Sequence, residues 1–273
     1  MSLVQALSGL PRFVVTPRAA KHRFFVFVDA TVLPDTRLNV MVRADDLAFG
    51  LLSSRIHEVW SLANASMHGV GNDPTYNAKS CFETFPFPEG LTPADTANQQ
   101  TEAIEGGALI PAGLSSTPVW AELVEAAAEN KDCSTGSWRM EKKGSGRTEE
   151  KGSGRTAGDV RSAAQAIARA AKRLNDLREA WLNPPEWTQR LPEVIPLGMQ
   201  TSPYPDRIVA KFGPEKDLAK LYNQRPVWLH AAHQTLDAAV AAAYGWADYT
   251  AEMPDEEILK RLLALNLARS KIG

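Results

Sequence analysis

Three short runs of apolar and β-branched residues near the N-terminus predict β-strands. They cover residues 13–15, 24–28 and 38–42. Next, Asp45 or Asp46 is placed to cap a helix, whose apolar residues recur at helical spacing as far as Ala63. Residues 66–89 are rich in glycine, proline and polar residues, so we expect a loop there. The first third of the chain is therefore predicted to be mixed α/β.

The last third of the chain has the apolar spacing of long helices. One helix is predicted from Asp159 to about Trp181, a second from Pro226 to Gly245, and a third from about Pro254. Proline at the start and glycine at the end of the second helix are typical boundary residues. The sequence thus indicates an α+β protein, in which a small mixed α/β region is followed by a mainly α-helical bundle.

The middle of the chain reads mostly as a connector, with a short helix expected near residues 120–129. The segment EKKGSGRT (141–148) is followed at once by EEKGSGRT (149–156), and the two are identical at seven of eight positions. Glycine, serine and charge without apolar residues predict a flexible linker. The expected organisation is therefore a first region at 1–90, a connector at 91–158 and a helical domain at 159–273.

Composition narrows the class of protein only slightly. The 273 residues carry a formal net charge of −2, which imposes no overall attraction to nucleic acid or membrane. Two cysteines cannot build a disulfide framework, so free thiols in a reducing compartment are expected. The first residues lack the pattern of a secretion signal, and no apolar run approaches the roughly 20 residues that span a bilayer. We therefore expect a cytoplasmic protein with no membrane partner.

The tripeptide Asn183-Pro184-Pro185 has two possible meanings. Amino-methylating DNA methyltransferases use Asn-Pro-Pro and an aromatic residue, after a strand, to grip a flipped-out base. Here a charged, helix-periodic stretch precedes it, so a helix stop is the favoured interpretation. The chain also lacks a glycine-rich turn between a strand and a helix. We therefore predict no catalytic residue and no bound cofactor in this chain, against the alternative of a complete enzyme that uses this motif.

Five ordered blocks in the first third resemble a known region. They are VTPR (15–18), AKHR (20–23), FGLLSSRIHEVW (49–60), GVGNDP (69–74) and FETFPFP (82–88). They are similar to the end of the target-recognition domain of MmeI-like DNA methyltransferases, the adenine-N6 enzymes of restriction-modification and phage-defence systems. The stretches 167–187, 218–246 and 255–269 resemble the helical tail of the same family.

This resemblance implies a recognition region and a tail without the catalytic domain. Double-stranded DNA would be the partner, and a methyltransferase domain on another chain would supply S-adenosylmethionine chemistry. The alternative is a stand-alone DNA-binding or interaction module, or a remnant without activity, which the duplicated linker favours.

Two sets of residues are candidates for DNA contact. The first is a basic set that supplies cations for phosphates: Arg12, Arg18, Lys21, His22 and Arg23. Its alternative role is a solvated rim, or ion pairs with Asp29 and Asp45. The second set lies in the polar stretch 64–82, where the resemblance places base-reading residues: Asn72, Asp73, Tyr76, Asn77 and Lys79. Its alternative is a turn whose side chains bond their own backbone, and Thr75 stands where many relatives have a basic residue.

Other polar residues fit structural roles better. His57 and Glu58 are adjacent on a predicted helix and so point in different directions, which excludes a catalytic dyad. His230 and His233 share a helix face but lack a clear third metal ligand. The rings of the FPFP segment at 85–88 are expected to pack in the core.

Overall fold

The computed structural model describes residues 3–68, 73–96, 100–114, 157–184, 188–191, 207–210 and 216–270. The elements of the first part are α1 (Leu3–Leu7), β1 (Arg12–Pro17), β2 (Val26–Asp29), β3 (Leu38–Met41), α2 (Asp46–Ser53), α3 (Arg55–Ala63), β4 (Ser66–His68), β5 (Asp73–Thr75), the π-helix η1 (Ala78–Phe82), β6 (Thr101–Ala103) and β7 (Leu109–Pro111). The elements of the second part are α5 (Ala157–Leu182), β8 (Thr188–Leu191), β9 (Arg207–Ala210), α6 (Leu218–Gln224), α7 (Val227–Tyr244) and α8 (Asp255–Ser270).

The three predicted N-terminal strands form one antiparallel sheet in the order β2-β1-β3. Successive side chains of a strand point to opposite faces. Accordingly, Val14 of β1 enters the main hydrophobic core, whereas Phe13 and Val15 pack on the other face in a small cluster with Leu7. The central strand β1 is therefore buried on both faces.

The helix expected after the sheet is in fact two helices. Asp45 is the cap, because its side chain accepts a hydrogen bond from the Ala48 N–H at 2.7 Å. Helix α2 ends at Ser53, and Ser54 adopts an extended backbone (φ −74°, ψ 152°). The Ser54 hydroxyl then caps α3 by accepting from the His57 N–H. Apolar spacing alone did not reveal this break, because both helices bury apolar residues in one core.

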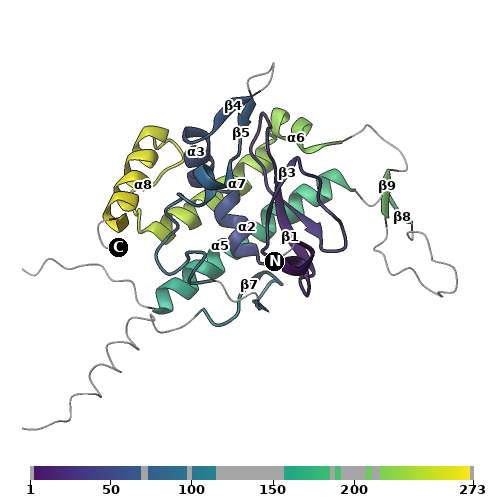
Figure 1. Cartoon of the computed structure of the whole chain (residues 1–273), viewed down its shortest axis with the longest axis horizontal. Coiled ribbons are helices and arrows are strands. Elements are labelled where there is room, and N and C mark those ends of the chain that lie inside the picture. The colour runs from purple at the N-terminus through teal and green to yellow at the C-terminus, as the bar shows by residue number, and fades with distance from the viewer. Residues whose placement is uncertain are drawn as a thin grey trace, which may run out of the picture.

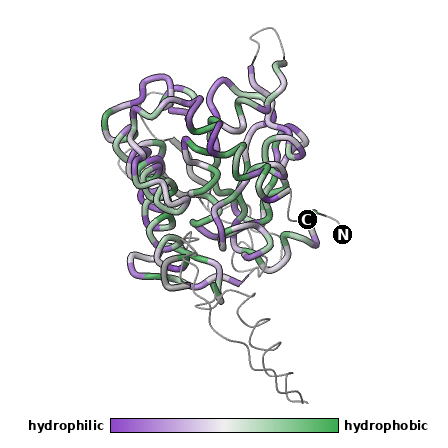
Figure 2. The backbone as a smooth tube through the Cα atoms, turned by 90° about the vertical axis from the view of Figure 1, so that its left-hand side faces the viewer, coloured by the Kyte–Doolittle hydropathy of each residue, from purple (hydrophilic) through white to green (hydrophobic). Residues whose placement is uncertain are grey.

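Helix α2 lies at the centre of the molecule, where α5 and α7 of the C-terminal part cross it (Figure 1). The close approach depends on Gly50, since a Cβ at this position would lie 2.8 Å from both Ala171 Cβ and Ile167 Cγ2. Leu236 of α7 completes the contact. Hydrophobic backbone segments gather in the interior of the tube view (Figure 2). The two ends of the chain thus share a single hydrophobic core.

The three long helices predicted for the C-terminal third are confirmed. Helix α7 has Pro226 as its N-cap and Gly245, at φ 78°, as its C-cap. Helix α5 ends at Leu182, and the Asn183 N–H still donates to the Glu179 carbonyl. The helix-stop interpretation of the Asn-Pro-Pro motif is confirmed, although Pro185 itself lies outside the described residues. The sequence analysis missed the short helix α6.

Two segments predicted to be irregular contain regular structure. The polar stretch 66–89 holds the antiparallel pair β4–β5 and the π-helix η1, so the loop prediction is wrong there. The region predicted to be connector holds the hairpin β6–β7, in which Ile110 is fully buried. The expected short helix near 120–129 and the duplicated linker at 141–156 lie outside the described residues.

Small antiparallel sheets combined with several helices confirm the α+β class. The phenylalanines of the FPFP segment pack as expected, with the rings of Phe85 and Phe87 buried and in edge-to-face contact. Within the described part of the chain, no helix combines the length and the apolarity needed to cross a membrane.

Candidate nucleic-acid interface

The backbone brings the two candidate sets together. The segment after β1 runs alongside β5, with an antiparallel bridge between Ala19 and Thr75. The Tyr76 N–H donates to the Arg18 carbonyl at 2.7 Å, and the Ala20 N–H donates to the Pro74 carbonyl. Two stretches separated by more than fifty residues therefore form one continuous strip of backbone.

Four side chains along and beside this strip present positive or titratable groups to solvent. Arg18, Lys21 and Lys79 are exposed and His22 is half-buried; we call these four residues the basic edge. None of the ion pairs formed within the described residues involves any of them. Exposed cations that are not neutralised by a carboxylate are suited to contact phosphates.

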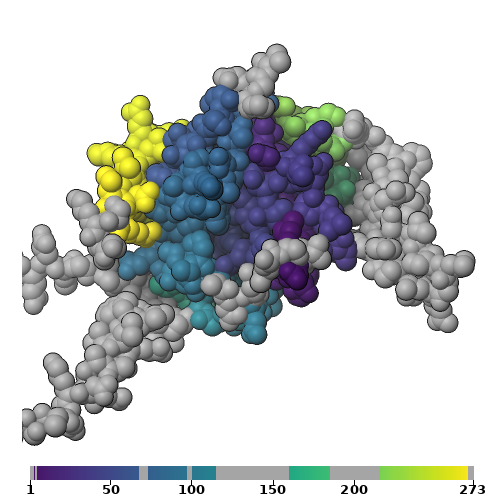
Figure 3. All heavy atoms as spheres, in the orientation of Figure 1, coloured from purple at the N-terminus to yellow at the C-terminus, as the bar shows by residue number. Residues whose placement is uncertain are grey.

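Asn223, which the sequence analysis overlooked, orients part of the basic edge. Its Oδ1 atom lies 2.9 Å from both Lys21 Nζ and His22 Nε2. Asn223 belongs to α6, so the C-terminal part of the chain meets the N-terminal part here, as the light-green and purple surfaces at the top of Figure 3 show. The contact joins positions about two hundred residues apart, and no local pattern in the sequence signals it.

Arg23 has a different position from the rest of its set. It is buried, and its guanidinium donates to the Thr16 hydroxyl and to the carbonyls of Pro17 and Pro74. It also lies over the Tyr76 ring, 5.1 Å from the centroid. Burial lowers the pKa of Arg23. In this structure Arg23 joins β1 to β5 and is turned away from solvent.

Tyr76 is likewise buried, at 2% exposure, and its hydroxyl lies 3.1 Å from His57 Nε2. His57 Nδ1 lies 2.9 Å from the Leu52 carbonyl, which can only accept, so Nδ1 carries the proton and Nε2 accepts from Tyr76. Burial lowers the pKa of His57 to about 3, so the ring is neutral at ordinary pH. His57 is therefore a buried side chain whose two ring nitrogens are both hydrogen-bonded, and it supports Tyr76 from the interior.

The remaining residues of the polar stretch differ in how far they are exposed to solvent. Asn77 is exposed, and its side chain accepts from the Lys79 N–H at 3.0 Å, as the turn alternative predicted. The NH2 group of the Asn77 side chain donates no hydrogen bond to another described residue. Asp73 is half-buried and starts β5. Asn72 lies outside the described residues.

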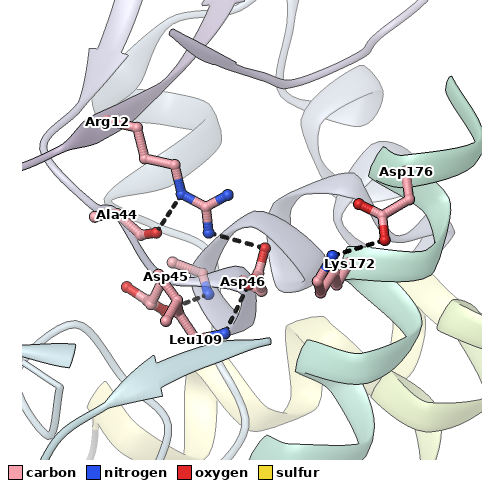
Figure 4. Close-up of polar contacts among 8 residues, drawn as sticks. Arg12, Ala44, Asp45, Asp46, Leu109, Lys172 and Asp176 are labelled. Carbon is pink, nitrogen blue, oxygen red and sulfur yellow. Dashed lines mark hydrogen bonds and ion pairs between the residues drawn. The ribbon is translucent and has the colours of Figure 1, made fainter. Parts of the chain in front are cut away.

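Arg12 has neither of its two predicted carboxylate partners. Its guanidinium donates to the Ala44 carbonyl at 2.9 Å and to Asp46 at 3.0 Å (Figure 4). The same guanidinium stacks 3.6 Å from the centroid of the Phe27 ring. Asp46 is buried and also accepts from the Leu109 N–H. Burial raises the pKa of Asp46, and Arg12 opposes that shift. Arg12 therefore ties the start of β1 to the start of α2.

Replacing Arg12 by methionine should lower the free energy of unfolding by about 2 kcal/mol, because the buried Asp46 loses its charged partner. Partial exposure of Arg12 keeps the loss below that of a fully buried pair. Urea denaturation at neutral pH measures it, with Arg18→Met as the matched exposed control. Equal stabilities of the two variants would contradict the structural role of Arg12.

The two histidines of α7 lie in different environments, and His230 is exposed. His233 is half-buried and its Nε2 lies 3.0 Å from the Tyr222 hydroxyl. Burial lowers the pKa of His233 to about 3. Among the described residues, no cluster of three or more potential metal ligands occurs. Cys81 is a buried free thiol, and Cys133 lies outside the described residues.

Comparison with known proteins gives a structural likeness alone. No family model and no curated protein matches the chain. Among solved structures, the fold is similar to that of the Type IIL restriction-modification enzyme MmeI, determined in complex with DNA, with a TM-score of 0.51 and 16% sequence identity. The match covers 95% of this chain and 21% of that one, so the chain spans about a fifth of the length of MmeI. At this identity the likeness supports an MmeI-like fold only coarsely.

Proposed function

We propose that this chain is the DNA-recognition and C-terminal helical portion of a site-specific DNA methyltransferase of a restriction-modification or phage-defence system. The observation that carries the proposal is the exposed strip, on which the basic edge and the polar stretch lie side by side. The structural likeness to a restriction-modification enzyme solved with DNA supports it.

In this proposal the residues of the strip have three different roles. Arg18, Lys21, His22 and Lys79 contact phosphates, and these contacts set affinity and position. Asn72, Asp73 and Asn77 supply hydrogen-bonding groups for base edges. Arg12, Arg23 and Tyr76 hold the strip in shape from the inside.

The methyl transfer itself would belong to a catalytic domain outside this sequence. That domain would bind S-adenosylmethionine and methylate adenine at N6 after flipping the base out of the duplex. The part played by this chain would be to hold the duplex in register, and it binds no cofactor of its own.

A salt-titrated DNA-binding measurement tests the proposal. We expect duplex binding whose affinity falls steeply with salt, and the double variant Arg18→Gln/Lys21→Gln should flatten the log-affinity against log-salt slope by about 2. Arg169→Gln, an exposed charge on α5, is the matched control and should leave the slope unchanged. Absence of duplex binding at low salt, or an unchanged slope in the double variant, would refute the proposal.

The second candidate function is a stand-alone DNA-binding module, which the duplicated linker favours. The two candidates differ in a methylation assay with the protein encoded next to this one. Methylated adenine in duplex DNA only when both proteins are present supports the split enzyme, and DNA binding without methylation supports the module.

A further inference from the structure

A cavity of about 300 Å³ lies away from the strip, between the start of α3, one face of α7 and the chain that joins α7 to α8. Its polar lining residues include Arg55, Arg225, His230, Gln234, Asp237 and Tyr249. The volume is at the lower end of the range for small-molecule sites, roughly 300–1,000 Å³. Several polar groups converging on one hollow are the usual signature of such a site.

The two arginines of the cavity are held in different ways. The Arg55 guanidinium donates to the carbonyls of Ala251 and Met253 and pairs with Asp255, so it is fixed in place. Arg225 is exposed, and no described residue accepts a hydrogen bond from its guanidinium or forms an ion pair with it. The cavity therefore has one cation that is bonded in place, Arg55, and one, Arg225, whose charge acts on the carboxyl groups of Glu58 and Asp237 without a hydrogen bond to either.

The backbone of Arg225 adds an independent observation. It closes α6 in the left-handed region at φ 40°, and it is the one non-glycine residue with positive φ in the described part of the chain. Glycine is the usual residue at such a helix end, because a side chain there strains the backbone. An arginine kept in a strained position at the mouth of a cavity indicates a role for its side chain.

The opposite wall of the cavity carries little negative charge. One Asp237 oxygen accepts from the Arg55 N–H at 2.7 Å, and burial raises the pKa of Asp237 to about 7. Its carboxyl group is therefore only partly ionised near neutral pH. His230, Gln234 and Tyr249 add ring, amide and hydroxyl groups. An anion entering the cavity meets the Arg225 guanidinium and several hydrogen-bonding groups, beside a carboxyl group that is only partly ionised.

We propose that this cavity binds the phosphate of a nucleotide, with Arg225 and His230 contacting the phosphate and Gln234 and Tyr249 contacting the remainder. Arginine suits phosphate because its donors match two oxygens at once. The phosphate can come from a free nucleotide or from the DNA backbone, since Arg225 lies two residues from Asn223, which contacts Lys21 and His22. The inference goes beyond the DNA-recognition role and does not depend on it.

Isothermal titration calorimetry of the full chain with deoxyadenosine monophosphate and with inorganic phosphate tests the proposal. We expect both to bind, the nucleotide more tightly, and Arg225→Gly to weaken the nucleotide at least tenfold. The glycine also relieves the backbone strain, so the melting temperature of this variant should be equal to or above that of the parent. His230→Gln should weaken the nucleotide severalfold, and Arg169→Gln is the control that should bind as the parent does.

A short duplex added to the nucleotide complex separates the two sources. Displacement of the nucleotide assigns the site to a DNA phosphate, and retention assigns it to a free nucleotide; both results support the cavity. No binding of either probe at millimolar concentration overturns the proposal, as does an Arg225→Gly variant that binds like the parent. Because the nucleotide titration needs no DNA, this proposal and the DNA-recognition proposal can fail separately.

Discussion

Replacing Gly50 by leucine should lower the free energy of unfolding by more than about 3 kcal/mol, the largest effect we expect from one substitution. A Cβ at this position already lies 2.8 Å from Ala171 and Ile167 of α5, and 3.3 Å from Leu236 of α7. These neighbours are buried in a close-packed core and have no space into which to move. The added side chain would force α2 away from the two helices that cover it.

Gly50→Ala separates the two opposing effects at this position. Alanine favours a helix over glycine by about 1 kcal/mol, whereas overpacking costs about 1–3 kcal/mol. We therefore expect a net loss of about 1 kcal/mol, in contrast to the gain that helix propensity alone predicts. Denaturation in urea measures both variants, and Ser162→Leu, at an exposed position of α5, is the control for an added leucine. A Gly50→Ala variant more stable than the parent would show that α2 and α5 are less tightly packed than described.

Asp237→Asn should raise the free energy of unfolding at pH 8 by about 2–4 kcal/mol. Burial raises the pKa of Asp237 to about 7 in the folded protein, against an ordinary value of 3.8. The unfolded chain therefore releases this proton first. The stability linked to Asp237 is complete below about pH 4 and is lost as the pH rises through 7. Asparagine has no proton to lose, and its amide oxygen can still accept from the Arg55 N–H.

Denaturation curves at pH 4.5 and pH 8 measure this effect. The parent and Asp237→Asn should differ much less in stability at pH 4.5 than at pH 8. Asp248→Asn is the matched control, because hydrogen bonds from Arg261 lower the pKa of this exposed carboxyl group to about 2. A stability difference between parent and Asp237→Asn that does not change with pH would contradict the raised pKa.

Much of the secondary structure was accessible from the sequence because local signals dominate there. The strand runs at 13–15 and 38–42 and the caps of α7 are examples, since each depends on neighbouring residues alone. The sequence did not reveal the break between helices at Ser54 or the hairpin β4–β5. Ser54 interrupts a regular apolar pattern only because its hydroxyl caps α3, and β5 pairs along a polar sequence with little apolar alternation.

The structure brings the two predicted sets of residues together, but it does not place all of their members at the surface. Charge identified Arg18, Lys21 and Lys79, which are exposed. Charge also selected Arg23, which lies in the interior. Burial of a cation depends on acceptors brought from distant parts of the chain, here the Pro74 carbonyl. A single sequence does not reveal such contacts, and for the same reason it did not indicate Asn223.

The central place of α2 has a consequence for how this protein is made. The helix leaves the ribosome more than a hundred residues before α5 and α7, which bury it. During that interval the nascent chain carries an apolar helix without its cover, a state prone to aggregation. Translation must therefore reach α7 before the first fifty residues acquire their native packing, and the long segment between them sets the length of the delay.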